Sequence, residues 1–163
     1  MNILLTGGSG FIGSHACLSF IRAGHRVTIY DNLSNSKENV ISRIKKITGK
    51  NIAFIKGDIL NQQMLSKAIS DNKIESVIHF AGLKSVSESI KNPLDYFDNN
   101  VAGTLSVLKA MEQNNIKKII FSSSATVYGV PEYLPIDEDH KLEPINPYGV
   151  GKKIIEDMLK DIA

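Results

Sequence analysis

The chain has 163 residues, of which 42% are hydrophobic and 22% are charged, and its formal net charge is +2. This composition excludes an internal disulfide, because Cys17 is the only cysteine, and a transmembrane span, because no apolar run approaches about 18 residues. The small charge and the scattered lysines argue against a nucleic-acid partner. We therefore expect one soluble, cytoplasmic domain over residues 1–163, with no nucleic-acid or membrane partner.

Five short runs rich in Ile, Val and Phe are the predicted strands. They are Asn2–Thr6, Val27–Asp31, Ile52–Lys56, Ser76–Ala81 and Lys118–Ser123. They lack polar alternation, which is typical of strands covered on both faces of a parallel sheet. Segments with helical periodicity separate them, and repeated strand–helix–strand units require right-handed crossovers. The predicted fold is therefore α/β, a doubly wound parallel sheet of the Rossmann type.

Three of the predicted helices have recognisable ends. The first is expected to end before Gly24, a typical C′ residue. Its expected apolar stripe consists of Ile12, Ala16, Phe20 and Ala23. A second helix is predicted over Asn92–Asn114 and a third over Asn146–Ala163, each beginning with an Asn N-cap followed by proline. The only extended loop is then Gly129–Pro147.

The first predicted strand runs directly into the glycine-rich turn Gly7–Gly13. Glycines at 8, 10 and 13 fit G-x-G-x-x-G, and glycines at 7, 10 and 13 fit G-x-x-G-x-x-G. Such glycines allow a sharp turn, a bare backbone against a pyrophosphate and close helix–sheet packing. Unpaired N–H groups at the helix start would hold phosphate without a Lys or Arg. The turn predicts a dinucleotide site; a glycine-rich turn without a ligand is the alternative.

Acidic residues end the second and third predicted strands. Asp31 lies 18 positions after Gly13, close to the spacing of about 20 that is expected for an acid binding the adenosine ribose. An acid there repels a 2′-phosphate and favours NAD over NADP; alternatively, Asp31 caps the loop Asn32–Ser36. Asp58 could accept a hydrogen bond from the adenine amino group, or it could cap the helix that begins near Asn61.

Tyr148 and Lys152 lie four residues apart in the last predicted helix, which places both side chains on one face. A tyrosine titrates near pH 10, so a base at neutral pH needs its pKa lowered by about 2–3 units. A neighbouring cation supplies about 1–3 units. The pair therefore predicts a general base, and a surface lysine beside a packed tyrosine is the alternative.

Ser124 follows the fifth predicted strand, at the edge where open α/β sheets bind ligands. We predict that its hydroxyl bonds a substrate hydroxyl or carbonyl and passes its proton to Tyr148. Alternatively, Ser124 belongs to a Ser/Thr-rich turn that satisfies its own backbone.

Several stretches together resemble the extended short-chain dehydrogenase/reductase family over the whole chain. They are Leu5–His15, Tyr30–Ser36, Gly57–Ile59, His79–Val86, Asp98–Val101 and Ser122–Gly129. Within the family, the resemblance is to enzymes that interconvert UDP-galactose and UDP-glucose at sugar carbon 4 with a tightly held NAD. Dehydratases of the family carry an Asp-Glu pair where this chain has Ala125-Thr126, which argues against water elimination.

The resemblance implies NAD contacts along much of the chain. These are Gly7, Gly10, Phe11 and Ile12 for the pyrophosphate, Asp31, Asn32, Asn35 and Ser36 for the ribose, Asp58 and Ile59 for the adenine, and Phe80, Ala81, Gly82, Lys84, Asn99, Ser122, Tyr148 and Lys152 elsewhere. It implies that Lys84, Ser124 and Tyr148 contact the UDP-sugar. Tyr148 would be the base, Lys152 would tune it, and Ser124 would bridge to the sugar. No metal site is predicted, because the four histidines lack metal-ligand spacing.

The resemblance also implies a homodimer in which the helices Pro93–Asn114 and Tyr148–Ile162 pair across the interface. Two features depart from the family pattern. Gly151 stands where relatives commonly have Ser or Thr, and in the family about as much sequence again follows the position of Ala163, supplying most uridine and sugar contacts. We expect the parent enzyme to epimerise UDP-sugars; the alternative is that this chain is an NAD-binding or dimerisation module without turnover.

Overall fold

The computed structural model describes residues 1–163, which form two compact units. The first unit comprises Met1–Ala81 and Leu105–Ser122, and the second comprises Gly82–Thr104 and Ser123–Ala163. The prediction of one domain over residues 1–163 is not tested by this division and stays a prediction. No helix of the chain is both long enough and apolar enough to cross a lipid bilayer.

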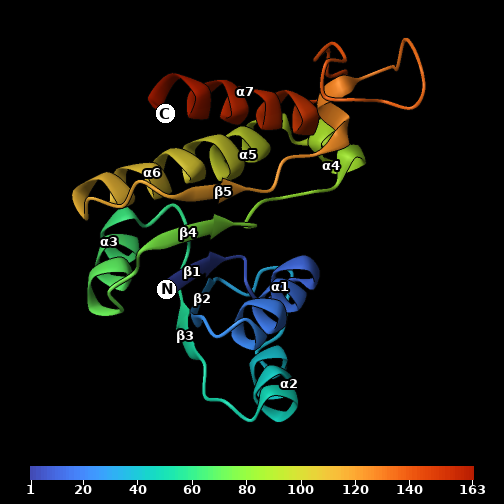
Figure 1. Ribbon diagram of the computed structural model, residues 1–163. Helices are drawn as coiled ribbons and strands as arrows, with labels where there is room; N and C mark the ends of the chain where they lie inside the picture. The colour runs from blue at the N-terminus through green and yellow to red at the C-terminus, as the bar shows by residue number, and fades with distance from the viewer. The chain divides into compact units, whose positions relative to one another are not determined.

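The first unit is built on a five-stranded sheet, in the order β3-β2-β1-β4-β5 (Figure 1). Its strands are β1 (Asn2–Thr6), β2 (Arg26–Asp31), β3 (Ala53–Lys56), β4 (Ser76–His79) and β5 (Ile119–Phe121). Every neighbouring pair is parallel. The predicted doubly wound parallel sheet is therefore confirmed. The fourth and fifth strands are shorter than predicted. β5 lies at the edge of the sheet, and only three of its residues pair with β4.

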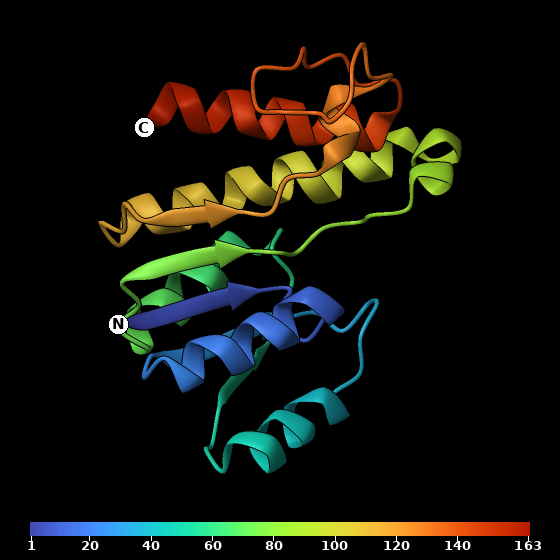
Figure 2. The same cartoon turned by 45° about the vertical axis from the view of Figure 1, so that its right-hand side comes forward.

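Consecutive strand residues point to opposite sides of the sheet, and on both sides the inner strands β1, β2 and β4 are buried against helices. Leu4, Tyr30 and Val77 lie in one core cluster with residues of α3 (Gln62–Asp71) and α6 (Gly103–Gln113). The second cluster joins Ile3, Leu5, Val27, Ile29 and Ile78 to α1 (Phe11–Arg22) and α2 (Asn39–Thr48). Figure 2 shows α1 and α2 on one face of the sheet and α3 and α6 on the other.

The first helix buries a different face from the predicted one. Ile12, the first residue of the predicted stripe, is 60% exposed. The buried positions are Gly13, Cys17 and Ile21. The contact face is therefore displaced by one residue, because the glycine at 13 lets the helix approach the sheet there. The predicted helix end is correct: Ala23 is the C-cap, and Gly24 follows with φ +86°.

The second unit is helical. It contains α4 (Val86–Lys91), α5 (Pro93–Tyr96), the π-helix η1 (Phe97–Ala102), the 3₁₀-helix η2 (Ala125–Tyr128) and α7 (Pro147–Ile162). The long helix α7 packs against α4, α5, η1 and η2. Its predicted start is confirmed, because the Asn146 side chain accepts a hydrogen bond of 2.8 Å from the Gly149 N–H.

The continuous helix predicted over Asn92–Asn114 is wrong in its middle. Asn92 and Pro93 do begin a helix, but after Tyr96 the chain widens into η1 before the α-helical pattern resumes at Gly103. The Gly103 N–H is bonded to the carbonyl of Asp98, five residues earlier. Such π-turns are rare and occur often at functional sites. Apolar spacing alone does not reveal them.

The assignment of Leu65 to the core of the first unit can be tested by mutation. Leu65 in α3 is fully buried in the cluster with Leu4 and Val107, whereas Leu60 is 50% exposed. Leu65→Ala should lower the free energy of unfolding by about 2–5 kcal/mol, because it removes buried methyl groups and leaves a cavity. Leu60→Ala should change it by less than about 0.5 kcal/mol. Urea denaturation of both variants measures the difference, and equal losses would contradict this core assignment.

Candidate functional site

The first unit has a topological switch point between β1 and β4, where the chain order reverses direction across the sheet. The Gly7 N–H donates to the Tyr30 carbonyl at 2.9 Å, and the Phe80 N–H donates to the Thr6 carbonyl at 3.0 Å. The segments that follow β1 and β4 are therefore held side by side at the carboxyl edge of the sheet. Ligands of open α/β sheets bind at this edge.

The glycines of the turn after β1 have separate structural reasons. Gly7 has φ +67°, and an added Cβ would lie 2.6 Å from the Ala81 nitrogen. A Cβ at Gly13 would lie 2.4 Å from the Gly7 carbonyl oxygen. At Gly10, in contrast, a Cβ would meet only the Gly7 oxygen, at 3.3 Å. Gly7 thus makes the sharp turn, Gly13 allows close packing, and Gly10 leaves bare backbone facing open space, as a pyrophosphate cradle requires.

The start of α1 supplies unpaired donors. Its N-cap, Gly10, has no side chain to cap the helix, and the N–H groups of Phe11, Ile12 and Gly13 have no acceptor within the protein. The first turn of the helix carries no acidic residue. Free N–H groups and the positive end of the helix dipole favour an anion at this place. The side chain of Phe11 is 77% exposed and that of Ile12 is 60% exposed.

Asp31 connects the end of β2 to the glycine turn. Its Oδ2 accepts from the Ser9 N–H at 3.0 Å, and its Oδ1 accepts from the Leu33 N–H at 2.8 Å and the Ser36 hydroxyl at 3.2 Å. The alternative of a loop cap is thus present, together with a bond to the turn that sequence reasoning missed. A carboxylate has about four acceptor positions, so roughly one stays open for a ribose hydroxyl. Asn35, also predicted at the ribose, is exposed.

Asp58 is tied to the same region. Its Oδ2 accepts from the Asn32 side-chain amide at 2.8 Å, and its Oδ1 accepts from the Leu60 N–H at 2.9 Å. The alternative that Asp58 caps α3 is wrong, because the N-cap is Asn61. Tyr30 donates its hydroxyl hydrogen to the Asp58 carbonyl at 2.9 Å, and burial, together with the Asp58 charge, raises the pKa of Tyr30 to about 12. Ile59, the predicted adenine contact next to Asp58, is buried in the core cluster.

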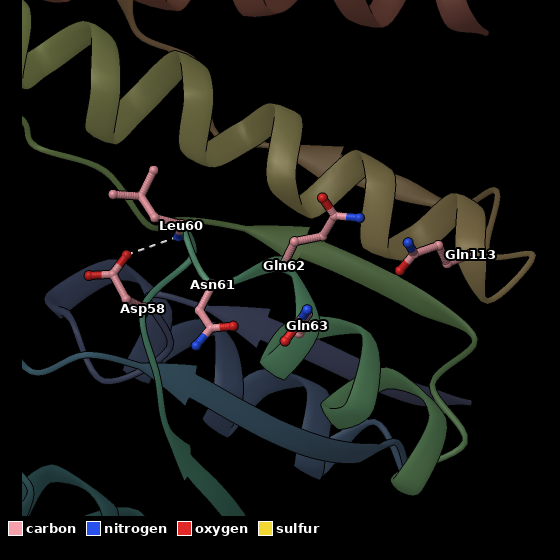
Figure 3. Close-up of a pocket in the computed structure, with 6 residues that line it drawn as sticks. All are labelled: Asp58, Leu60, Asn61, Gln62, Gln63 and Gln113. Atoms are coloured by element: carbon pink, nitrogen blue, oxygen red, sulfur yellow. Dashed lines mark hydrogen bonds between the residues drawn. The ribbon is translucent and has the colours of Figure 1, made fainter.

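A pocket lies beside the start of α3, as Figure 3 shows. It is lined by Asp58, Leu60, Asn61, Gln62, Gln63 and Gln113. Asp58 is its only residue among the predicted site residues. Beside the Asp58 carboxylate, its amide side chains supply hydrogen-bond donors and acceptors but no additional charge.

In the second unit, Asn100 holds the segment that begins at Gly82. Its side-chain oxygen accepts from the Leu83 N–H at 2.8 Å, and its amide donates to the Leu83 carbonyl at 2.9 Å. The side-chain amide of the predicted Asn99 donates to the same oxygen at 2.8 Å. Lys84 follows this anchored segment and is exposed. The role of Asn100 in holding Leu83 was not predicted from the sequence. The direction of its side chain depends on the π-helix η1, which apolar spacing does not reveal.

The Tyr148–Lys152 pair lies on one face of α7, as predicted. The Lys152 Nζ is 5.8 Å from the centre of the Tyr148 ring. The side chain of Lys152 is only 6% exposed, and burial lowers its pKa to about 8, against the opposing effect of Glu156. Tyr148 is half-buried, and its ring meets Tyr96 edge-on with 6.4 Å between centres. A buried cation beside a phenol stabilises the phenolate.

Ser124 is the N-cap of η2. Its Oγ accepts from the Thr126 N–H at 3.3 Å and from the Thr126 hydroxyl at 2.9 Å. The alternative of a self-satisfying turn is therefore realised, and no hydrogen bond joins Ser124 to Tyr148. The Ser124 hydroxyl hydrogen still needs an acceptor, which a bound sugar oxygen could supply. Ser122, in the first unit, donates its N–H to the His79 carbonyl at 3.1 Å and so extends the β4–β5 ladder.

Comparison with known proteins gives one family. Residues 4–163 match the family described as GDP-mannose 4,6 dehydratase. The UDP-glucose 4-epimerase of Bacillus subtilis (strain 168) is 49% identical over 162 residues, which are 99% of this chain and 48% of that protein. The UDP-glucose 4-epimerase of Dictyostelium discoideum is 51% identical over 161 residues, 99% of this chain and 47% of that protein. This chain spans about half the length of the curated relatives it matches.

Solved structures of UDP-glucose 4-epimerases are also similar to this chain. The UDP-glucose-4-epimerase of Stenotrophomonas maltophila with bound NAD and formylated UDP-arabinopyranose is 44% identical, with a TM-score of 0.98 over 100% of this chain and 48% of that one. The UDP-glucose 4-epimerase of Bifidobacterium longum in complex with NAD+ and UDP is also 44% identical, with a TM-score of 0.97 over 99% and 49% of the two chains.

The glycine turn predicts unequal effects of one methyl group. Gly13→Ala should lower the free energy of unfolding by about 1–3 kcal/mol, because its Cβ would strike the backbone of Gly7 and Gly8. Gly10→Ala should cost clearly less, because its Cβ meets one atom at 3.3 Å. Denaturant unfolding of the two variants measures this order, and a reversed order would contradict the separate roles given to the two glycines.

Burial of Lys152 predicts a stability that depends on pH. The pKa of Lys152 falls from 10.5 to about 8 on folding, so between these values the unfolded chain holds a proton that the folded chain has released. The contribution of Lys152 to the free energy of unfolding should therefore rise with pH from 8 to 10.5, by up to roughly 3 kcal/mol. Above pH 9 the buried Cys17, whose pKa is raised from 9.0 to about 11, contributes in the opposite direction in both proteins, so the difference between them isolates Lys152. In Lys152→Met this rise should be absent. Urea midpoints across that pH range measure it, and parallel curves for both proteins would be inconsistent with a buried, titrating Lys152.

Proposed function

Because the chain belongs to the GDP-mannose 4,6 dehydratase family, we propose that it carries the NAD-binding and proton-transfer residues of a UDP-glucose 4-epimerase. The proposed activity of the whole enzyme is the interconversion of UDP-galactose and UDP-glucose. The observation that carries the proposal is the glycine cradle at 7, 10 and 13, combined with a cation–phenol pair in α7. The relatives named above, at 44–51% identity, support this particular reaction.

The glycine turn fits a dinucleotide. Gly10 leaves the backbone bare, and three N–H groups at the start of α1 lack protein acceptors. We infer that the pyrophosphate is held by Gly7, Gly10, Phe11 and Ile12. The ribose and adenine are then held by Asp31, Asn32, Asn35, Ser36, Asp58 and Ile59, and the rest of the cofactor by Phe80, Ala81, Gly82, Lys84, Asn99, Ser122, Tyr148 and Lys152. When bound, NAD supplies a reversible hydride acceptor for carbon 4 of the sugar.

Tyr148 is the proposed base. Its phenolate would take the proton of the sugar 4-hydroxyl and return it later, with Ser124 bonding the same oxygen. Lys152 supports this role because its buried ammonium lies 5.8 Å from the centre of the Tyr148 ring. Lys84, exposed after the anchored Leu83, is proposed to contact the UDP-sugar.

The side chains next to Ser124 favour epimerisation over dehydration as the proposed reaction. Elimination of water needs a further acid and base close to the sugar. The two residues after Ser124 are Ala125 and Thr126, which carry no carboxyl group, and the Thr126 hydroxyl donates to Ser124. Among the relatives described above, the protein names also give 4-epimerases rather than dehydratases.

A second candidate is an NAD-binding or dimerisation module without turnover. This candidate requires the glycine cradle or an exposed apolar helix face, but not the Tyr148–Lys152 pair. We also infer a homodimer through the helices Pro93–Asn114 and Tyr148–Ile162, supported by exposed apolar side chains on α5, α6 and α7. These are Leu94, Leu105, Ile154 and Ile162. We propose a cytoplasmic location, which suits the single buried thiol of Cys17.

Binding and turnover of the purified chain separate the two candidates. Calorimetry with NAD should give binding that Gly10→Val weakens at least tenfold, because the added side chain would occupy the cradle. Conversion of UDP-galactose, coupled to UDP-glucose oxidation, should fall by about 10²–10⁴ in Tyr148→Phe if the base is correct. Tyr133→Phe, an exposed loop tyrosine bonded to Asp137, is the matched control and should change neither measurement.

NAD binding without any conversion would favour the module. Absence of NAD binding by the folded chain would overturn the proposed cofactor site, which both candidates include.

A further inference from the structure

Glu156 is an ionisable residue of α7 to which no role has been given so far. Its Oε1 accepts a short hydrogen bond from the Ser123 hydroxyl. Ser123 directly precedes Ser124, so this bond joins the turn that carries the proposed sugar-binding hydroxyl to the helix that carries Tyr148. Glu156 is half-buried, which strengthens such a charge-assisted bond relative to one in water.

The same carboxylate lies one helical turn after Lys152. Residues four apart on a helix are neighbours on its surface, with Cβ atoms about 5–6 Å apart. Burial lowers the pKa of Lys152, and the Glu156 charge acts in the opposite direction. On this helix the titratable neighbours of Lys152 are Tyr148 on the preceding turn and Glu156 on the following one. Tyr96, on α5, contacts the Tyr148 ring. Glu156 is thus the negative charge that favours the ammonium form.

We propose that Glu156 is a positioning residue for the Tyr148–Lys152 pair: its carboxylate fixes the Ser123–Ser124 turn against α7 and places a negative charge one helical turn from the buried Lys152. The inference rests on the proposed function, because it matters for catalysis only if Tyr148 is the base. Its electrostatic half stands independently, because it concerns two side chains of one helix.

Two variants separate the halves of the proposal. Glu156→Gln removes the charge but keeps an oxygen that can accept from Ser123. Ser123→Ala removes the hydrogen bond but keeps the charge. Asp157→Asn is the matched control, because it neutralises the next residue of the same helix, which is paired with Lys153 at 2.8 Å.

The first measurement is the NMR titration of the Lys152 side chain in the folded chain, which needs neither NAD nor turnover. Glu156→Gln should lower the Lys152 pKa by about one unit. Ser123→Ala and Asp157→Asn should leave it within about 0.2 units. A Lys152 pKa that is unchanged in Glu156→Gln would overturn the electrostatic half.

The second measurement is the pH profile of UDP-galactose conversion in an active preparation of the enzyme. Glu156→Gln should move the alkaline limb of kcat to lower pH by about one unit, because Lys152 then loses its proton earlier. Ser123→Ala should raise KM without moving that limb. Equal loss of activity at every pH in both variants would indicate a merely structural role and overturn the proposal.

The two failures are distinguishable. A shifted Lys152 titration without NAD binding or conversion would leave the Glu156–Lys152 coupling intact and remove the proposed function. Normal conversion of UDP-galactose together with an unshifted Lys152 pKa in Glu156→Gln would remove the Glu156–Lys152 coupling and leave the proposed function intact.

Discussion

The first unit depends on a steric constraint: at Gly7 the backbone that leaves β1 touches the backbone that leaves β4. An added Cβ would lie 2.6–2.9 Å from three backbone atoms of Phe80 and Ala81, and the positive φ of Gly7 excludes most other residues as well. The contact closes the sheet edge around the start of α1. The chain therefore enters α1 at Phe11, Ile12 and Gly13 with N–H groups that have no acceptor within the protein. An anion-binding end is thus a consequence of packing rather than of any basic side chain.

The sheet could be predicted from the sequence because its inner strands β1, β2 and β4 are buried on both faces. A continuous apolar run such as Leu4-Leu5 next to Ile3 is difficult to place anywhere except in the middle of a layered α/β unit. The first helix was less well predicted. Ile12 looks like a core residue by periodicity, yet the close approach at Gly13 turns the helix so that Cys17 and Ile21 face the sheet. Tertiary contact overrode the amphipathic pattern.

Most hydrogen bonds around the candidate site residues could not be predicted from the sequence. Spacing alone placed Tyr148 beside Lys152, because four residues span about one turn of any α-helix. Spacing could not show that Asp31 bonds the Ser9 N–H, or that Asn100 anchors Leu83, because these bonds join residues distant in sequence. At Asp31 and Ser124 the structural alternative and the ligand-binding prediction are compatible, since each side chain retains hydrogen-bonding capacity beyond its local contacts.

The π-helix η1 (Phe97–Ala102) determines how this part of the chain responds to the deletion of one residue. A π-turn accommodates one additional residue, and one residue corresponds to about 100° of rotation around the helix axis. Loss of a single amino acid here would turn the Asn100 amide away from Leu83 while leaving the helix itself intact. Codon deletions are often harmless in a surface loop and are usually severe in a strand. In this segment the helical content would survive, and the damage would consist of a side chain facing the wrong direction.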